Sequence, residues 1–149
     1  MPFRCEIVTQ DRQLFSGEVD AVYAPGAEGD LGILPRHTPL LTTLKYGVLR
    51  VVHDREEEVF AIAGGILEVR PERVTVLADQ GENIEEIDVA RAEQAKARAE
   101  AFLSEGRRAD SPQWQEAQAA LRRSNLRLSA IRRFRRGRPP ASEVPQTKP

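Results

Sequence analysis

Arginines near the C-terminus are the residues of this chain whose spacing points most clearly to chemistry. Residues 122 to 138 hold eight arginines and no acid, whereas residues 1 to 121 hold 13 Lys and Arg against 22 Asp and Glu. In a helix, Arg123 and Arg127 lie one turn apart on one face, so both can donate hydrogen bonds to one phosphate. This stretch predicts contact with an anionic partner: nucleic acid, a nucleotide, an anionic membrane or an acidic protein. A solvated basic helix without a partner is the alternative.

Other patterns that could support catalysis are weak. The glycine-rich segment 24 to 32 lacks the Gly-Lys-Ser/Thr ending of a P-loop, so it favours a strand connection. His37 and His53 are too few to form a metal cluster without well-placed carboxylates, so we predict no metal site. The serines have no nucleophile-elbow context. We therefore predict no catalytic residues and a protein that is not an enzyme.

The composition is that of a soluble globular protein, with 40% hydrophobic and 30% charged residues. No apolar run is long enough to span a bilayer, and the N-terminus lacks the apolar core of a secretory signal. Cys5 is the only cysteine, which excludes a disulfide framework and CxxC redox chemistry. We expect a cytoplasmic chain without direct membrane insertion.

The segment from residue 3 to 79 consists of short apolar runs interrupted by Gly and Pro. Breaks at Gly47 and at Gly64-Gly65 leave pieces too short for ordinary helices. Several short strands with turn signals between them are typical of a β-sandwich. This part predicts about ten short strands and no helix before residue 80.

After Gly81 the composition changes to helix-forming Ala, Glu, Gln and Arg. Asp88 is the predicted N-cap of a helix that runs to about Glu105. Ser111, followed by Pro112 at the first helical position, predicts a second helix to about residue 136. The fold class is thus α+β: an N-terminal β-sandwich followed by a C-terminal antiparallel two-helix hairpin. The predicted divisions are a sandwich over 1–84, a hairpin over 85–137 and a disordered tail over 138–149.

One narrow stripe of the second helix is predicted to pack against the first. Its members follow heptad-like spacing: Trp114, Ala117, Leu121, Ser124, Leu128 and Ile131. The facing side of the first helix is rich in alanine, so the two helices bury little area. We infer that the hairpin is only marginally stable and can switch between two arrangements.

Four sequence blocks resemble the epsilon subunit of bacterial F-type ATP synthases. They span residues 26–42, 63–71 and 74–79, and the Ile-Asp-Val-Ala-Arg-Ala segment at 87–92. The resemblance implies a non-catalytic central-stalk protein that couples rotation between the c-ring and the catalytic head in proton-driven ATP synthesis. The sandwich would bind the gamma subunit and c-ring. The helices would extend toward the catalytic alpha and beta subunits and inhibit ATP hydrolysis. Location would be the cytoplasmic face of the bacterial plasma membrane, peripheral through the complex.

The resemblance also implies site residues. ATP, as a regulatory ligand rather than a required cofactor, would bind Glu82, Ile87, Asp88, Arg91, Ala92, Arg98, Arg123 and Arg127. Contact with the rotor would use Asp30 and His37. Inhibitory contact with a catalytic beta subunit would use Arg123, Arg127, Arg132, Arg133, Arg135 and Arg136. Arg36 stands where a glycine is common in the family.

A sandwich with a nucleic-acid-binding arm is an alternative that explains the arginines. It does not explain the four blocks. Its second helix offers only Trp114 and Phe134 as aromatic partners for bases, so we predict no nucleic-acid partner. A small independent enzyme is the other alternative, and no spacing frames an acid–base pair or a nucleophile for it.

Overall fold

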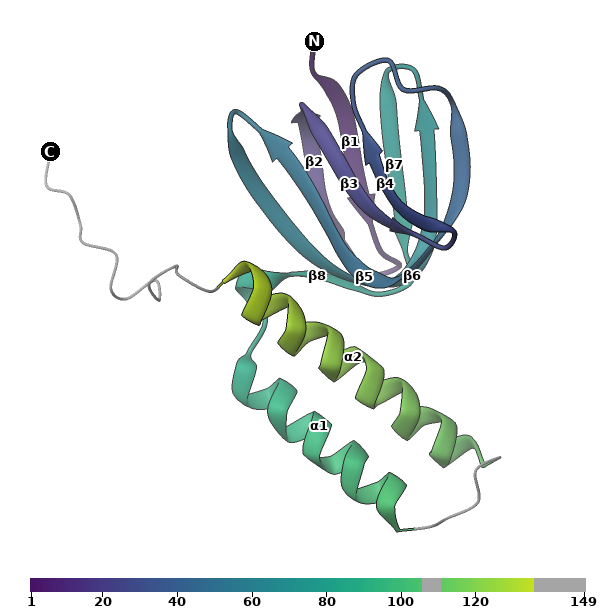
Figure 1. Ribbon diagram of the computed structural model, residues 1–149, viewed down its shortest axis with the longest axis vertical. Helices are drawn as coiled ribbons and strands as arrows, with labels where there is room; N and C mark the ends of the chain where they lie inside the picture. Colours follow the sequence, from purple (N-terminus) through teal and green to yellow (C-terminus); the bar gives the residue numbers. More distant parts are fainter. Residues whose placement is uncertain (106–110, 136–149) are drawn as a thin grey trace, which may run out of the picture.

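The computed structural model describes residues 1–105 and 111–135. A β-sandwich lies at one end of the molecule and a helical hairpin at the other, with the N-terminus on the far side of the sandwich from the hairpin (Figure 1). The elements, in chain order, are β1 Phe3–Val8, β2 Gln13–Val19, β3 Ala21–Gly26, β4 Gly29–Ile33, β5 Leu40–His53, β6 Glu56–Arg70, β7 Arg73–Ala78, β8 Gly81–Asn83, the 3-10 helix η1 Ile84–Glu86, α1 Val89–Ser104 and α2 Pro112–Phe134. The predicted sandwich followed by two helices is confirmed.

The strands follow the order β2-β1-β7-β6-β5-β3-β4, with β8 paired to β6. All described pairings are antiparallel except that of β1 with β7. β5 and β6 pair along their whole length and curve, so the sheet folds over on itself (Figure 1). The described part of the chain therefore contains two long strands of 14 and 15 residues where several shorter ones were expected.

Glycines bend β6 where a strand end was expected. Gly64 and Gly65 have φ angles of 86° and 144°, which L side chains rarely adopt. A Cβ on Gly65 would lie 2.3 Å from the Leu77 carbonyl oxygen of the neighbouring strand. Because glycine removes that clash, β6 turns sharply without losing its pairing with β5 and β7.

The sandwich encloses its own hydrophobic core. All buried members of this cluster lie between Phe3 and Ala78, and Ile7, Leu49 and Phe60 are fully buried. None of them comes from a helix. The sandwich therefore has a core that does not depend on the hairpin.

A second apolar cluster joins α2 to the outer face of β5 and β6, and we name it the docking cluster. Its buried members are Val59, Ala61, Ile84, Ile87 and Ala130, with half-buried Val48, Leu126, Ile131 and Phe134 packed against them. Leu126, Ala130 and Phe134 are spaced four residues apart and so share one helix face. The predicted single stripe was incomplete, because α2 has this second apolar face as well.

Both helices begin where their capping residues predicted. The Asp88 carboxylate accepts a hydrogen bond from the Arg91 amide at 3.1 Å, and the Ser111 hydroxyl accepts one from the Trp114 amide at 3.1 Å. Along the seam, Ala92, Ala99 and Ser124 are buried. α2 ends at Phe134 with Arg135 as its C-cap, close to the predicted end near residue 136. The predicted tail over 138–149 lies outside the described residues.

Candidate functional site

A polar cleft opens where β8, η1, the start of α1 and the middle of α2 meet. It has a volume of about 420 Å³, within the range typical of small-molecule sites. Seven of the eight residues predicted to bind ATP line it: Glu82, Ile87, Asp88, Arg91, Ala92, Arg98 and Arg127. Glu86 lines it too and was not predicted. We call this space the upper cavity.

Local structure positions the sandwich side of the cleft. β8 pairs with β6, which fixes Glu82 opposite Ala61. The Asn83 side chain then accepts a hydrogen bond from the Glu85 amide at 2.9 Å and caps η1. This short 3-10 turn leads directly to Ile87 and to the Asp88 cap of α1, so the segment 82–88 forms one ordered wall.

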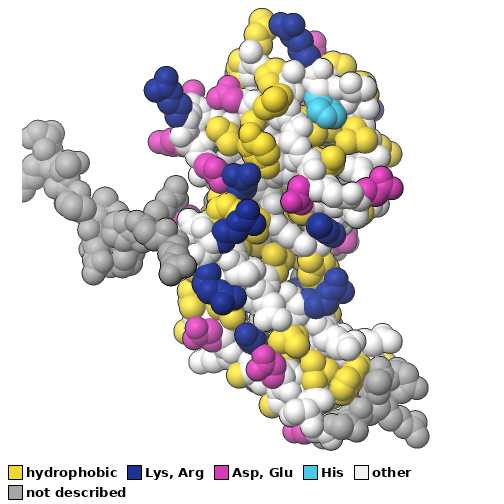
Figure 2. All heavy atoms as spheres, in the orientation of Figure 1, with side chains coloured by type: hydrophobic (Ala, Val, Ile, Leu, Met, Phe, Trp, Pro, Cys, Tyr) yellow, Lys and Arg dark blue, Asp and Glu magenta, His cyan; other side chains and the backbone are white. Residues whose placement is uncertain are grey.

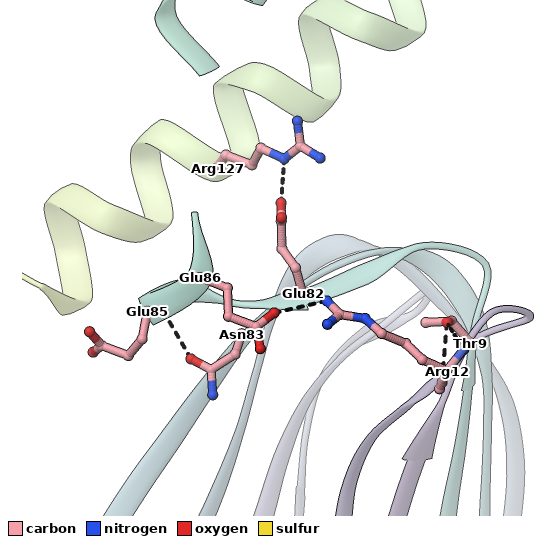
Figure 3. A network of polar contacts seen from close by, with 7 residues as sticks. All are labelled: Thr9, Arg12, Glu82, Asn83, Glu85, Glu86 and Arg127. Carbon is pink, nitrogen blue, oxygen red and sulfur yellow. Dashed lines mark hydrogen bonds and ion pairs between the residues drawn. The ribbon is translucent and has the colours of Figure 1, made fainter. Parts of the chain in front are cut away.

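An ion pair crosses the cleft from the sandwich to α2. The Arg127 Nε donates a hydrogen bond to the Glu82 Oε1, although the two residues are 45 positions apart in the chain (Figure 3). The Glu82 side chain is 22% exposed and that of Arg127 37% exposed, so water screens the pair only in part. Glu82 therefore holds the guanidinium of a predicted phosphate ligand.

A second cavity of about 340 Å³ lies on the other side of this ion pair, and we call it the lower cavity. Glu82 and Arg127 line both cavities. Arg123, the eighth predicted residue, lines the lower one together with Arg12. The Arg123 guanidinium forms an ion pair with Glu116 at 2.9 Å.

Arg91 and Arg98 lie on the exposed surface of α1 beside the upper cavity. Within the described residues, neither has a carboxylate in ion-pair distance. Ile87 and Ala92 are buried, at 6% and 2% exposure. The cleft thus combines two guanidinium groups that no described carboxylate pairs with and a partly apolar wall, an arrangement suited to a nucleoside phosphate.

The arginines of the last turn of α2 have mixed surroundings. Arg135 donates from Nη1 to the Ile87 carbonyl oxygen at 3.3 Å, and its Nε lies 3.8 Å from the Glu85 carboxylate. The Arg133 guanidinium lies 5.0 Å from the centre of the Phe134 ring, and Arg132 is exposed. Arg136 lies outside the described residues. In Figure 2, Lys and Arg side chains gather around the junction between sandwich and hairpin.

Cation–π contacts that the sequence did not predict join α2 to β5, and β5 to β3. The Arg122 guanidinium lies 4.4 Å from the centre of the Tyr46 ring. The Arg50 guanidinium lies 4.6 Å from the ring centre of Tyr23 and 5.8 Å from that of Phe134. Such cation–π contacts stabilise the docked helix modestly. No local sequence pattern predicts these cation–π contacts, because each joins residues far apart in the chain.

The two predicted rotor-contact residues lie outside the cleft. Asp30 is exposed on β4, and His37 follows in the turn after β4, its Nδ1 2.6 Å from the Thr38 carbonyl oxygen. Arg36 in that turn has a φ of 66°, the left-handed conformation that favours glycine. This explains why a glycine suits the position.

Large hydrophobic side chains are exposed on the part of the sheet that the hairpin leaves uncovered. Leu41, Ile66 and Leu77 are 70%, 44% and 51% exposed. Ile66 lies opposite Leu77 on the neighbouring strand, and Leu41 lies on β5, the next strand in the sheet. These three side chains therefore leave neighbouring apolar surface exposed to water on this face of the sheet.

The described helices include none that is long and apolar enough to cross a membrane. The described residues also hold no group of three or more His, Cys, Asp or Glu side chains arranged to bind a metal ion.

Comparisons with known proteins agree on one family. The profile described as "ATP synthase, Delta/Epsilon chain, beta-sandwich domain" matches residues 2–84, and the "long alpha-helix domain" of the same chain matches residues 85–132. The chain is 47% identical to an ATP synthase epsilon chain of Dehalococcoides mccartyi over 133 residues, covering 89% of this chain and 94% of that relative. It is also 47% identical to that of Herpetosiphon aurantiacus over 138 residues, covering 93% and 99%.

A solved structure supports the same fold. One chain of the Euglena gracilis mitochondrial ATP synthase, in a structure of its OSCP, F1 and c-ring, superposes with a TM-score of 0.74. The match covers 87% of this chain and 81% of that chain at 22% identity. At this identity the likeness concerns the fold.

Proposed function

The chain belongs to the ATP synthase epsilon chain family, and from this membership we propose how it works in the complex. It is a non-catalytic component of the central stalk that couples rotation between the c-ring and the catalytic head in proton-driven ATP synthesis. Its place is peripheral, at the cytoplasmic face of a bacterial plasma membrane. The independent core of the sandwich supports this role, because a unit that transmits torque must stay folded whatever the hairpin does.

The sandwich binds the gamma subunit and the c-ring. The exposed row of Leu41, Ile66 and Leu77 supports a protein partner on the uncovered face, since burying these side chains would remove apolar surface from water. Asp30 and His37 remain the candidates for contact with the rotor.

The hairpin senses ATP. The observation that carries this proposal is the Glu82–Arg127 ion pair, which joins sandwich and α2 inside a cleft lined by seven of the eight candidate residues. A triphosphate can take Arg127 from Glu82, because phosphate offers the same bidentate acceptor geometry with more charge. The released Glu82 carboxylate can then accept a hydrogen bond from the adenine amino group. ATP would favour the docked hairpin by its differential affinity for that state.

The undocked hairpin inhibits ATP hydrolysis through its arginines. In the docked state, Arg123, Arg127 and Arg135 contact Glu116, Glu82 and the Ile87 carbonyl oxygen of the chain itself. The contacts of Arg127 and Arg135 are lost when α2 leaves the sheet, whereas the Arg123–Glu116 pair lies within α2. Undocking therefore frees the positive charge of Arg127 and Arg135 for acidic surfaces of the catalytic alpha and beta subunits. Docking thus competes with inhibition.

Calorimetry with magnesium and ATP tests the sensor. We expect saturable binding to the isolated chain, and loss of that binding in an Arg123→Ala, Arg127→Ala double variant. The matched control is Arg132→Ala, Arg133→Ala, which removes the same charge from exposed positions of α2 that do not line either cavity. Circular dichroism verifies folding of all three. No binding at millimolar ATP, or equal loss in the control, refutes the sensor.

Hydrolysis assays test inhibition separately. A complex assembled with a chain that lacks residues 88–149 should hydrolyse ATP faster than the intact complex at low ATP. Equal rates would refute the inhibitory role while leaving the coupling role in place.

A further inference from the structure

Arg12 is a sandwich residue that lines the lower cavity. It lies in the turn between β1 and β2, which Thr9 fixes: the Thr9 amide donates to the Arg12 carbonyl oxygen at 2.9 Å, and the Arg12 amide lies 3.3 Å from the Thr9 hydroxyl. This local bonding directs the side chain of Arg12 toward η1 (Figure 3).

The guanidinium of Arg12 is held in the same way as that of Arg127. Its Nη2 donates to the Glu86 Oε2 at 2.8 Å, across 74 positions of sequence. Glu82 and Glu86 both line the upper cavity, and Arg12 and Arg127 both line the lower one. The two carboxylate–guanidinium pairs therefore lie along the boundary between the cavities.

The lower cavity has the composition of a site for a magnesium-bound polyphosphate. Arg12, Arg123 and Arg127 bring three guanidinium groups to it from two parts of the fold. Asp11, Asp79 and Glu82 line it as well. These carboxylates disfavour a bare polyphosphate and suit one whose charge a divalent cation partly neutralises.

We propose that Arg12 binds the terminal phosphates of a nucleoside triphosphate whose base lies in the upper cavity. The proposal rests on the proposed ATP-sensing function and adds a ligand from the sandwich to those from the hairpin. On binding, Arg12 exchanges the Glu86 carboxylate for phosphate oxygens, as Arg127 exchanges Glu82. The nucleotide then bridges the β1–β2 turn and α2 directly. A nucleotide with more phosphates should therefore stabilise the docked hairpin more.

Calorimetry with Mg-ATP and with AMP tests Arg12, because AMP lacks the phosphates that Arg12 would contact. In Arg12→Ala we expect ATP affinity to fall about tenfold, as for a partly exposed charge-assisted contact, with AMP affinity unchanged. Arg12→Lys keeps the positive charge but cannot donate two parallel hydrogen bonds. Its ATP affinity should therefore lie between that of the wild type and that of Arg12→Ala. Arg73→Ala is the matched control, since Arg73 is 51% exposed against 50% for Arg12, and pairs with a sandwich carboxylate, Glu6, away from both cavities.

A merely structural role for the Arg12–Glu86 pair gives a different pattern. Glu86→Gln breaks the pair but leaves Arg12 free, so ATP should bind at least as tightly as to the wild type. The proposal is overturned if Glu86→Gln weakens ATP binding as much as Arg12→Ala does. It is also overturned if Arg12→Ala weakens ATP binding and AMP binding equally. Wild-type binding together with unchanged binding by Arg12→Ala overturns only the role of Arg12. Absence of binding to the wild type overturns the ATP sensor as well.

Discussion

Replacing Ala130 by Asp should undock the hairpin without unfolding the sandwich. Ala130 is 1% exposed and faces Val59, Ala61, Ile84 and Ile87 in the docking cluster. An aspartate is too short to carry its carboxylate out of that cluster to water. The sandwich core contains no helical residue, so it should remain intact.

The magnitude follows from what α2 buries. Leu126, Ile131 and Phe134 are half-buried against the sheet, and at about 1.5–3 kcal/mol per fully buried side chain they contribute roughly 3 kcal/mol together. The partly exposed Glu82–Arg127 pair adds about 1 kcal/mol. An unpaired buried carboxylate costs about 3–5 kcal/mol. The conformational entropy lost when the helix docks already offsets part of the stabilisation from these contacts. The cost of burying the aspartate is therefore enough to favour the undocked hairpin.

Hydrogen–deuterium exchange resolves the two parts of the molecule. In Ala130→Asp, the amides of α2 should lose protection while those of β1, β6 and β7 keep theirs. Trypsin should also cleave α2 faster at its arginines. Ala97→Asp is the control, because Ala97 is exposed on α1 and the change carries the same loss of helix propensity.

Two results would contradict this reasoning. Parallel loss of protection in the sandwich strands would mean that both clusters form one cooperative core. Unchanged protection of α2 would mean that the docking cluster contributes little and that the polar and cation–π contacts hold the helix.

Three further predictions concern the sandwich. Gly65→Ala should destabilise the chain by about 2–3 kcal/mol in urea unfolding, because its Cβ would lie 2.3 Å from the Leu77 carbonyl oxygen at a φ of 144°. Gly17→Ala should lower the free energy of unfolding far less, because its Cβ would meet only the Phe15 ring at 3.5 Å. Arg36→Gly should raise stability by about 0.5–1 kcal/mol by relieving the left-handed φ of 66°, and an unchanged or lower urea midpoint would argue against strain there. Burial, with the charge of Glu6 adding to it, raises the pKa of the Cys5 thiol from 9.0 to about 12. The folded chain keeps this proton while the unfolded chain loses it above pH 9, so stability should fall between pH 9 and 12 by up to about 1.4 kcal/mol per pH unit, and Cys5→Ser should flatten that slope.

Much of the candidate site followed from the resemblance and not from physical derivation. Composition and spacing indicated an anionic partner for the arginines of α2, and the family resemblance supplied the remaining candidates, four of which lie in the 87–92 block. The structure brings seven of them to one cleft. Arg12 and Glu86 had no signal in the sequence, since an isolated arginine in a turn and a glutamate after a strand are ordinary surface residues.

Local hydrogen bonding explains what the sequence by itself determined. The caps at Asp88 and Ser111 each bond an amide three residues ahead, so the starts of both helices are encoded in a few neighbouring residues. The change from strands to helices after Gly81 is likewise a matter of local propensity.

Tertiary packing decided the rest. Gly64 and Gly65 look like a strand end in isolation, and only the pairing of β6 with β5 and β7 makes them a bend within one strand. Which face of α2 meets the sheet depends on the exposed apolar surface of β5 and β6 that it must cover. The Glu82–Arg127 and Arg12–Glu86 pairs join residues 45 and 74 positions apart. The first pair forms only when α2 docks on the sandwich, and the second only when the β1–β2 turn and η1 lie side by side, because no local interaction brings those charges together.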